Sequence, residues 1–329
     1  MFNITALRTL AYCGLTATTC VSQAIVMRHD KADRLYRELA ANDKYAAVGL
    51  IEWKVTDGDT EYGTANYIGV GTGGKKWLVT AGHNLNEEMD WCRFTIGGHT
   101  YDIELQSRRW VDPPEEGLDD IGVARILDPR SRLTLRPARF WNDTIPIPAN
   151  VDSRTIGTAV GFGRPGTGTK GMGNADKVKR AMTNRIDGLN VRRGDDETVH
   201  GYLTDFDRND RAHNMLDAKD VDDTGFPNSQ RSSRTWLDLE GQIAPGDSGG
   251  GLFAEVNGIT AMVGITSGTV GLGVAHDRYG AISKFTPFNR ALSRRVTGWT
   301  GIKAVPEPSS LVALGVAVAG LIARKRRRR

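Results

Sequence analysis

Three short motifs in this chain contain residues that could form a nucleophilic catalytic site. The first is Gly246-Asp247-Ser248-Gly249-Gly250, in which a serine stands among glycines. A serine hydroxyl is a weak nucleophile until a base takes its proton, and the reaction also needs backbone N–H groups that face the developing oxyanion. Glycine before the serine allows a substrate carbonyl to approach closely. The motif predicts Ser248 as a nucleophile, with the N–H groups of Gly246 and Ser248 as oxyanion donors.

The other two motifs supply a candidate base and a carboxylate that could orient it. His83 directly follows an apolar run and two small residues, which places its imidazole at a strand end. Asp120 stands directly before the buried-strand pattern 121–127, so its carboxylate can accept the Nδ1–H of His83 and select the tautomer. Asp119 is the competing candidate, but it would point to the opposite side of an extended chain. The remaining histidines lie in polar or turn contexts and are expected to be exposed: His29, His99, His200, His213 and His276.

The elements that must position these residues are short. The chain contains 39 glycines, well above the usual share of about 7%, and many short apolar runs, which favours an all-β protein with many turns. Thr286-Pro287 predicts a short C-terminal helix, with Thr286 as the N-cap. The runs that we interpret as strands are 46–53, 67–70, 77–80, 101–105, 121–127, 156–162, 251–254, 259–266 and 279–282.

Taken in the order His, Asp, Ser, the three motifs resemble the trypsin/chymotrypsin family of serine proteases over residues 46–292. Segments 157–163 and 263–268 also resemble family strands. The resemblance implies two six-stranded antiparallel β-barrels in a protease domain at 46–300, with an insertion at 188–233. It implies a serine endopeptidase that cleaves proteins or peptides through an acyl-enzyme intermediate. The alternative is a catalytically inactive protease-fold protein that binds at the cell surface or in the extracellular matrix.

The same resemblance assigns a substrate pocket to Gln242, Ser267, Gly268 and Gly280. Trypsin-like members carry an acidic residue at the position of Gln242, and an uncharged floor cannot pair with a Lys or Arg side chain. We therefore do not expect a trypsin-like cleavage preference. Pro245, directly before the nucleophile motif, is a second departure from the family pattern.

The N-terminal residues 1–24 have the layout of a secretory signal peptide, with small residues before a possible cut after Ala24. Such a cut would expose Ile25-Val26. In the resembled family, a new N-terminus of this kind forms an activating ion pair with the aspartate at the position of Asp247. We therefore consider an Ile25–Asp247 pair, against an ordinary mature terminus in which 25–45 is a charged linker.

At the other end, residues 304–329 combine Pro306-Glu307-Pro308, an apolar run at 311–323 and a cluster of six basic residues. This pattern resembles the bacterial PEP-CTERM sorting signal. It implies export to the envelope or exterior of a Gram-negative-type bacterium, with signal peptidase and an exosortase-type enzyme as processing partners. Thirteen apolar residues span only about 20 Å, short of the ~30 Å hydrocarbon core, so we expect a short membrane helix. A plain membrane anchor is the alternative.

Several other classes of function are disfavoured. The net charge is +4, but the last six residues contribute +6, so the body has no basic surface typical of nucleic-acid binding. The segment 205–216 faintly resembles a calcium loop, but Asp210 and Leu216 occupy positions that need Gly and Glu. We expect no metal and no cofactor. Cys92, the one cysteine outside the predicted signal, is interpreted as a buried apolar residue.

Overall fold

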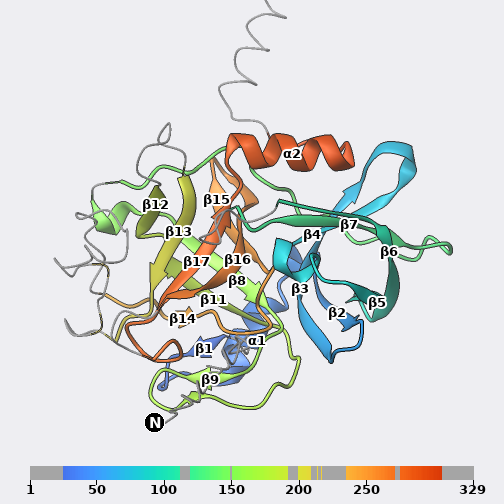
Figure 1. Cartoon of the computed structure of the whole chain (residues 1–329). Helices are drawn as coiled ribbons and strands as arrows, with labels where there is room; N and C mark the ends of the chain where they lie inside the picture. The colour runs from blue at the N-terminus through green and yellow to red at the C-terminus, as the bar shows by residue number, and fades with distance from the viewer. Residues whose placement is uncertain are drawn as a thin grey trace, which may run out of the picture.

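Two groups of β-strands lie side by side, and a C-terminal helix lies across one end of both (Figure 1). The computed structural model describes residues 25–111, 119–148, 150–191, 199–208, 213, 216, 235–270 and 275–305. The predicted signal peptide and residues 306–329 of the sorting signal lie outside the described residues, as does most of the predicted insertion.

The first group is a closed barrel of six strands in the order β2-β3-β4-β7-β6-β5. In β5, Cys92, Phe94 and Ile96 are buried and alternate with exposed Arg93, the period of two expected for a strand with one buried face. The strands are β2 (Val48–Val55), β3 (Thr60–Val70), β4 (Lys76–Thr80), β5 (Met89–Ile96), β6 (His99–Trp110) and β7 (Gly122–Leu127).

The second group is a seven-stranded antiparallel sheet in the order β11-β8-β15-β16-β17-β13-β12. The predicted all-β fold with a six-stranded barrel and a short C-terminal helix is confirmed, although this half is a seven-stranded sheet where a second six-stranded barrel was expected. The strands are β8 (Ile156–Gly161), β11 (Arg180–Arg185), β12 (Gly188–Val191), β13 (Val199–Asp205), β15 (Gly251–Val256), β16 (Ile259–Val270) and β17 (Ile282–Pro287).

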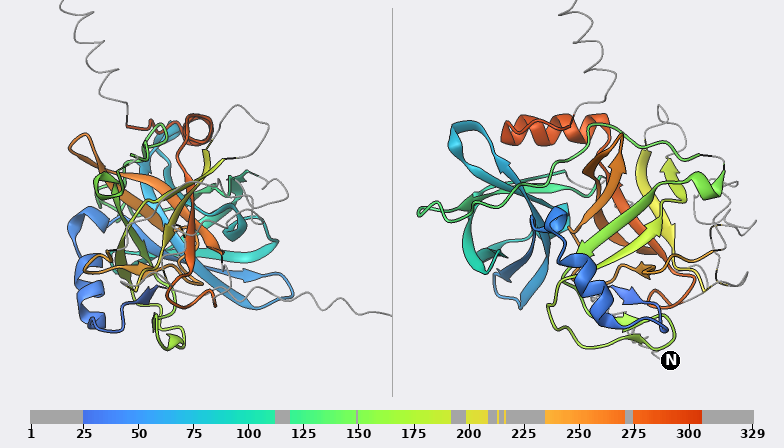
Figure 2. Two further views of the ribbon diagram at one scale, coloured as in Figure 1. Left: turned by 90° about the vertical axis from the view of Figure 1, so that its left-hand side faces the viewer. Right: turned by 180° about the vertical axis from the view of Figure 1, so that it is seen from behind.

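The segment 25–45, which the sequence suggested as a linker, is folded onto the second group. It forms β1 (Val26–Met27), α1 (Asp33–Ala40) and a short 3₁₀ turn. Helix α1 contacts β11. It faces the viewer in the right-hand view of Figure 2, where the molecule is seen from behind. Its fully buried Tyr36 hydroxyl accepts a hydrogen bond from Arg28 N (3.0 Å) and donates one to Glu240 O (2.9 Å). These bonds connect the segment to a small sheet ordered β10-β9-β1-β14, whose other strands are β9 (Gly166–Thr167), β10 (Gly171–Met172) and β14 (Gly241–Gln242).

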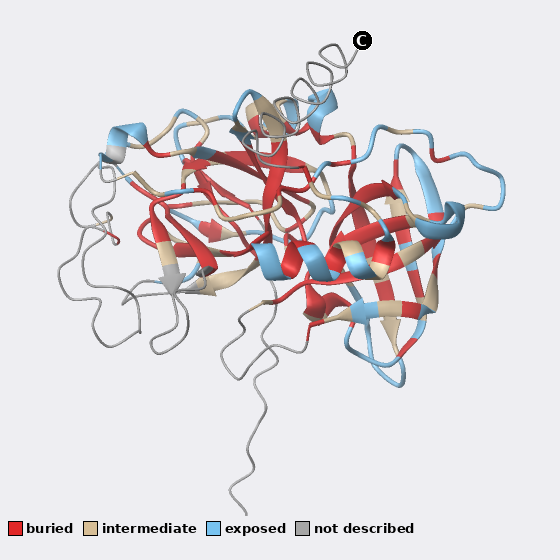
Figure 3. Cartoon of the chain, turned by 90° about the horizontal axis from the view of Figure 1, so that it is seen from above, coloured by how far each residue is buried: buried red, intermediate tan, exposed pale blue. Residues whose placement is uncertain are grey.

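The C-terminal helix α2 (Arg290–Thr300) begins later than the sequence suggested. Thr286 and Pro287 end β17, so the prediction that Thr286 caps the helix is wrong. Asn289 is the N-cap, and its side chain accepts from Leu292 N at 2.8 Å. Pairing of β17 with β16 and β13 outweighs the local capping preference. Figure 3 shows buried and exposed residues alternating along α2.

Strand prediction was incomplete. Of the strands longer than two residues, β5, β11, β12 and β13 were not predicted, and the run at 279–282 lies mostly before β17. Two of them, β12 and β13, fall in the predicted insertion and belong to the sheet. Among the described residues, no helix is both long enough and apolar enough to cross a membrane; the predicted membrane segment 311–323 lies outside them.

Candidate active site

Strand β4 presents His83 at the junction of the two groups, in a 3₁₀ turn (Gly82–Asn84) directly after the strand. The turn places the backbone and the ring of His83 against one carboxylate. His83 N donates to Asp120 Oδ1 (3.0 Å), and His83 Nδ1 lies 2.7 Å from Asp120 Oδ2. Because one carboxylate binds both groups, the imidazole has a single orientation, with Nε2 left for another partner.

The Asp120 side chain is buried, with 6% of its surface exposed, whereas the His83 ring is partly exposed. Ser267 Oγ donates a further hydrogen bond to Asp120 Oδ2 at 2.9 Å. Burial alone would raise the pKa of Asp120, but the hydrogen bonds from His83 and Ser267 outweigh it and lower that pKa. Burial alone would lower the pKa of His83, but the Asp120 carboxylate outweighs it and raises that pKa. The Asp120 carboxylate therefore stabilises the charged imidazole that forms when His83 takes up a proton.

The competing aspartate has a different partner. Asp119 Oδ1 lies 3.3 Å from His200 Nδ1, and Asp119 has a positive φ of 63°. The structure thus separates the two candidates, with Asp120 on His83 and Asp119 on His200. The expectation that His200 is exposed is wrong, because β13 lies inside the sheet and leaves only 9% of the residue exposed.

The loop that carries Ser248 is held against the first barrel by its backbone. Ser248 O accepts hydrogen bonds from Thr64 N (2.9 Å) and from the side chain of Asn84 (2.8 Å), the residue that follows His83. Gly249 has a φ of 86°, and a Cβ there would lie 2.2 Å from Thr64 O. Only glycine fits this position, so the tight turn brings Ser248 to the rim where His83 lies.

The predicted oxyanion donors are the backbone N–H groups of Gly246 and of Ser248 itself. Among the described residues, neither Gly246 N nor Ser248 N donates a hydrogen bond to a protein acceptor. Within the same described part of the chain, the Ser248 hydroxyl makes no hydrogen bond to His83. Hydrogen bonds between catalytic groups are often long or absent before substrate binds.

The predicted pocket residues lie on three segments. Gln242 is fully buried in β14, and its Oε1 accepts from Ser283 Oγ at 2.8 Å. Gln242 Nε2 has no hydrogen-bond partner among the described residues. Gly268 follows Ser267 on β16, and a Cβ at Gly268 would have no neighbour within 4 Å. Gly280, with a φ of 88°, lies before β17. Of the four, the structure brings Ser267 to the candidate triad.

Asp247 and Ile25 are both buried, and no ion pair between them is present among the described residues. The Asp247 carboxylate accepts from Gly163 N (3.2 Å) and Ala244 N (3.1 Å). Burial raises the pKa of Asp247 to about 7, although these amides and Arg180 act in the opposite direction. The uncut chain therefore holds a buried carboxyl group whose hydrogen-bond partners, within the described part of the chain, are backbone amides.

Sequence reasoning missed the residues that bind the two halves of the site together. Ser267 was predicted only as a pocket residue. It is the extra residue at a register shift between Thr266 and Gly268 of β16, which turns its hydroxyl toward Asp120. Thr64 and Asn84 were not singled out at all. The bulge has no local signal, because it arises from the register in which β16 pairs with β17, the next strand along the chain.

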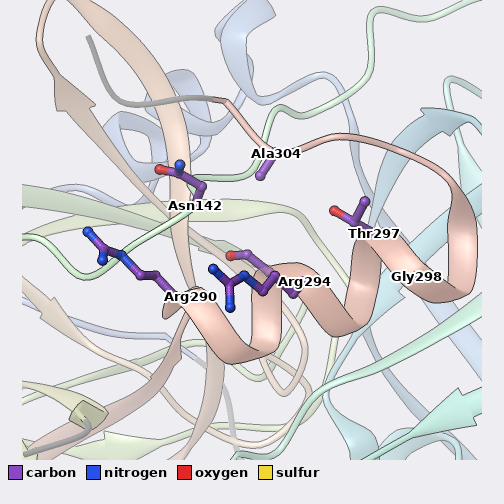
Figure 4. A pocket seen from close by; sticks show the side chains of 7 residues that line it. Asn142, Arg290, Arg294, Thr297, Gly298 and Ala304 are labelled. Carbon is purple, nitrogen blue, oxygen red and sulfur yellow. The ribbon is translucent and has the colours of Figure 1, made fainter. Parts of the chain in front are cut away.

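Other features carry no part of this site. A surface pocket at α2 contains none of the predicted site residues (Figure 4); it is lined by Asn142, Arg290, Ser293, Arg294, Thr297, Gly298 and Ala304. Within the part of the chain that the structure describes, no group of three or more His, Cys, Asp or Glu side chains could hold a metal ion. Cys92 is buried, as predicted, and burial raises the pKa of its thiol to about 12.

Comparison with known proteins identifies one segment of the chain. Residues 304–328 match the PEP-CTERM protein-sorting motif, which confirms the predicted signal and indicates export to the envelope or surface of a Gram-negative bacterium. No curated protein matches the chain.

Solved structures with a similar course of the chain include three proteases. HL collagenase has 13% identity and a TM-score of 0.47, covering 78% of this chain and 94% of that chain. The protease Anisep from Arthrobacter nicotinovorans has 8% identity and a TM-score of 0.49, covering 78% and 96%. The thermostable serine protease AL20 from an extremophilic microorganism has 11% identity and a TM-score of 0.45, covering 77% and 96%.

Proposed function

We propose that this protein is an exported serine endopeptidase with His83, Asp120 and Ser248 as its catalytic triad. The observation that carries the proposal is the buried Asp120 carboxylate on Nδ1 of His83, at the rim that also carries the Ser248 loop. Asp120 selects the tautomer in which Nε2 is a free acceptor, the form that a general base needs.

The chemistry follows from these positions. His83 Nε2 takes the proton of the Ser248 hydroxyl as Oγ attacks the carbonyl carbon of a peptide bond. Gly246 N and Ser248 N donate to the oxyanion that forms. The imidazolium, stabilised by Asp120, then protonates the leaving amine, and an acyl-enzyme is left on Ser248. Water, activated by His83, hydrolyses the ester and restores the hydroxyl.

The pocket favours uncharged side chains of the substrate. Gln242 has no charge, and its oxygen already accepts from Ser283. Gln242 offers no negative charge to a Lys or Arg side chain, and an unpaired buried charge costs several kcal/mol. We therefore expect cleavage after residues other than Lys and Arg, in a pocket formed by Gln242, Ser267, Gly268 and Gly280.

We also propose that cutting after Ala24 creates an ion pair between the new Ile25 amine and Asp247. Val26 pairs antiparallel with β14 and parallel with β9. Because Val26 pairs with Gln242 in antiparallel register, the chain beside Ile25 continues from Gln242 toward Ala244. Because Val26 pairs with Gly166 in parallel register, the chain on the other side of Ile25 comes from Gly163. Ala244 and Gly163 supply the amides that hold Asp247, so the register directs Ile25 toward that carboxylate.

The sorting motif supports the cellular part of the proposal. The signal at 1–24 would direct export and be removed by signal peptidase, and an exosortase-type enzyme would process the C-terminal segment. The substrates would then be proteins or peptides at the cell surface or outside it. An inactive protease-fold binding protein of the cell surface or extracellular matrix is the second candidate.

Hydrolysis of casein or gelatin by the purified exported form distinguishes the two candidates. We expect hydrolysis and labelling by a fluorophosphonate probe, both lost in Ser248→Ala. In the triad template, loss of one member leaves only about 10³–10⁴-fold of rate enhancement over water. Equal hydrolysis by Ser248→Ala, or no labelling of the unchanged protein, would refute the peptidase assignment.

A further inference from the structure

Asp119 and Asp120 are adjacent, and the second group of strands holds both of their carboxylates. Ser267 of β16 donates to Asp120, and His200 of β13 lies 3.3 Å from Asp119. The proposed triad explains why Asp120 has a hydrogen-bond partner. It gives no role to Asp119 or to the buried His200.

The backbone at Asp119 is strained. Its φ of 63° lies in the left-handed region, which is unfavourable for a residue with a Cβ, although less so for aspartate than for most others. A left-handed residue changes the direction of the chain, so its conformation decides where the next side chain points. The direction of the Asp120 side chain, and with it the orientation of His83, thus depends on Asp119 keeping this conformation.

His200 is placed to hold Asp119. Its side chain is only 11% exposed, and its strand is fixed by antiparallel pairing of β13 with β17. Among the described residues, His200 Nε2 is buried without a hydrogen-bond partner, so the ring's hydrogen bond goes to Asp119 through Nδ1. A buried imidazole with one unsatisfied nitrogen is unfavourable for stability alone.

We propose that His200 is a positioning residue for the triad: it holds Asp119 in the left-handed conformation and thereby keeps Asp120 on Nδ1 of His83. The proposal rests on the proposed peptidase function. It adds two residues to the triad, neither of which touches the substrate: Asp119, next to Asp120 in the chain, and His200, supplied by the opposite group of strands.

The consequence is a specific kinetic pattern. Releasing Asp119 loosens the Asp120–His83 contact, so kcat falls while KM stays nearly constant. The acidic groups that raise the pKa of His83 are Asp120 and Glu87. A looser Asp120 therefore lowers the pKa of His83 and moves the acid limb of the kcat/KM profile to lower pH.

The test compares His200→Ala with His200→Asn, whose amide can donate from the position of Nδ1. We expect kcat to fall about 10- to 100-fold in His200→Ala, less than the ~10⁴-fold loss of an aspartate-to-amide change in the triad. KM should change less than about twofold, and His200→Asn should recover most of the rate. Asp57→Ala is the matched control, because Asp57 is also a left-handed aspartate (φ 57°) but lies in an exposed turn.

Titration of His83 by NMR, in a Ser248→Ala background, gives a readout that needs no turnover. Its pKa should be lower in the His200→Ala background and restored by His200→Asn. A lower melting temperature with unchanged kcat and unchanged His83 pKa would show a merely structural role and overturn the proposal. If the unchanged protein hydrolyses nothing but the His83 pKa still responds, the peptidase function fails and the positioning stands.

Discussion

Two adjacent aspartates of this protein have different partners because the chain turns between them. Asp120 lies on His83 and Ser267, whereas Asp119 lies on His200. The roles of identical side chains are therefore set by one positive φ angle and by two strands of the opposite group.

Replacing Asp120 by asparagine should abolish most activity without unfolding the protein. An amide in place of the carboxylate can hold the wrong tautomer of His83, and in the triad template this lowers kcat about 10⁴-fold. We expect nearly unchanged KM and circular dichroism. A loss of less than tenfold would remove Asp120 from the triad.

The pH dependence of kcat/KM should report the raised pKa of His83. His83 must be neutral to accept the serine proton, so activity falls as the pH drops through that pKa. Because Asp120 raises it, the acid limb should lie above the ordinary histidine value of about 6.5. A limb at or below that value, measured with a substrate that does not titrate nearby, would contradict the assigned pair.

At the scale of elements, strand pairing overrides local preferences. Thr286-Pro287 has the residues of a helix start, yet both end β17 because they pair with Ile265 and Gly264 of β16. The helix begins where pairing ends, and Asn289 provides the cap.

The two candidate caps of α2 predict opposite results. Asn289→Ala should lower the free energy of unfolding by about 1 kcal/mol, because Leu292 N loses its acceptor. Thr286→Val, its control, should cost less, since the buried Thr286 hydroxyl has no partner among the described residues. Thermal or urea unfolding measures both, and the reverse order would restore Thr286 as the cap.

At the scale of the molecule, the N-terminal segment joins the candidate site to the second group of strands. Segment 25–45 inserts β1 between β14 and β9, and Tyr36 secures it through Arg28 and Glu240. The proposed activation thus needs a cut next to a strand that is already in place.

Asp247→Asn should have opposite effects on the stability of the uncut and the cut chain. In the uncut chain, burial raises the pKa of Asp247 to about 7, so stability falls as the pH rises from about 4 to 7. Removing the carboxyl group should then stabilise the uncut chain at pH 8, by up to about 4 kcal/mol. In a chain that begins at Ile25, the same change should destabilise, because it removes the ion pair.

Urea unfolding of both forms at pH 5 and pH 8 checks the reversal. The buried groups Asp187 and Glu240 also have raised pKa values, about 8 each, so only the difference between Asp247→Asn and its parent is informative. The same sign in both forms would refute the ion pair.

The sequence alone determined the candidate residues and the class of fold. The three motifs in their order, the short apolar runs and the many glycines can all be recognised from neighbouring residues alone. The same is true of the sorting signal at the C-terminus. Only the tertiary structure decided which aspartate meets His83, that Ser267 joins it, and that His200 is buried. These depend on a backbone angle, a bulge and strand pairings between residues far apart in the chain, and no local pattern records such contacts.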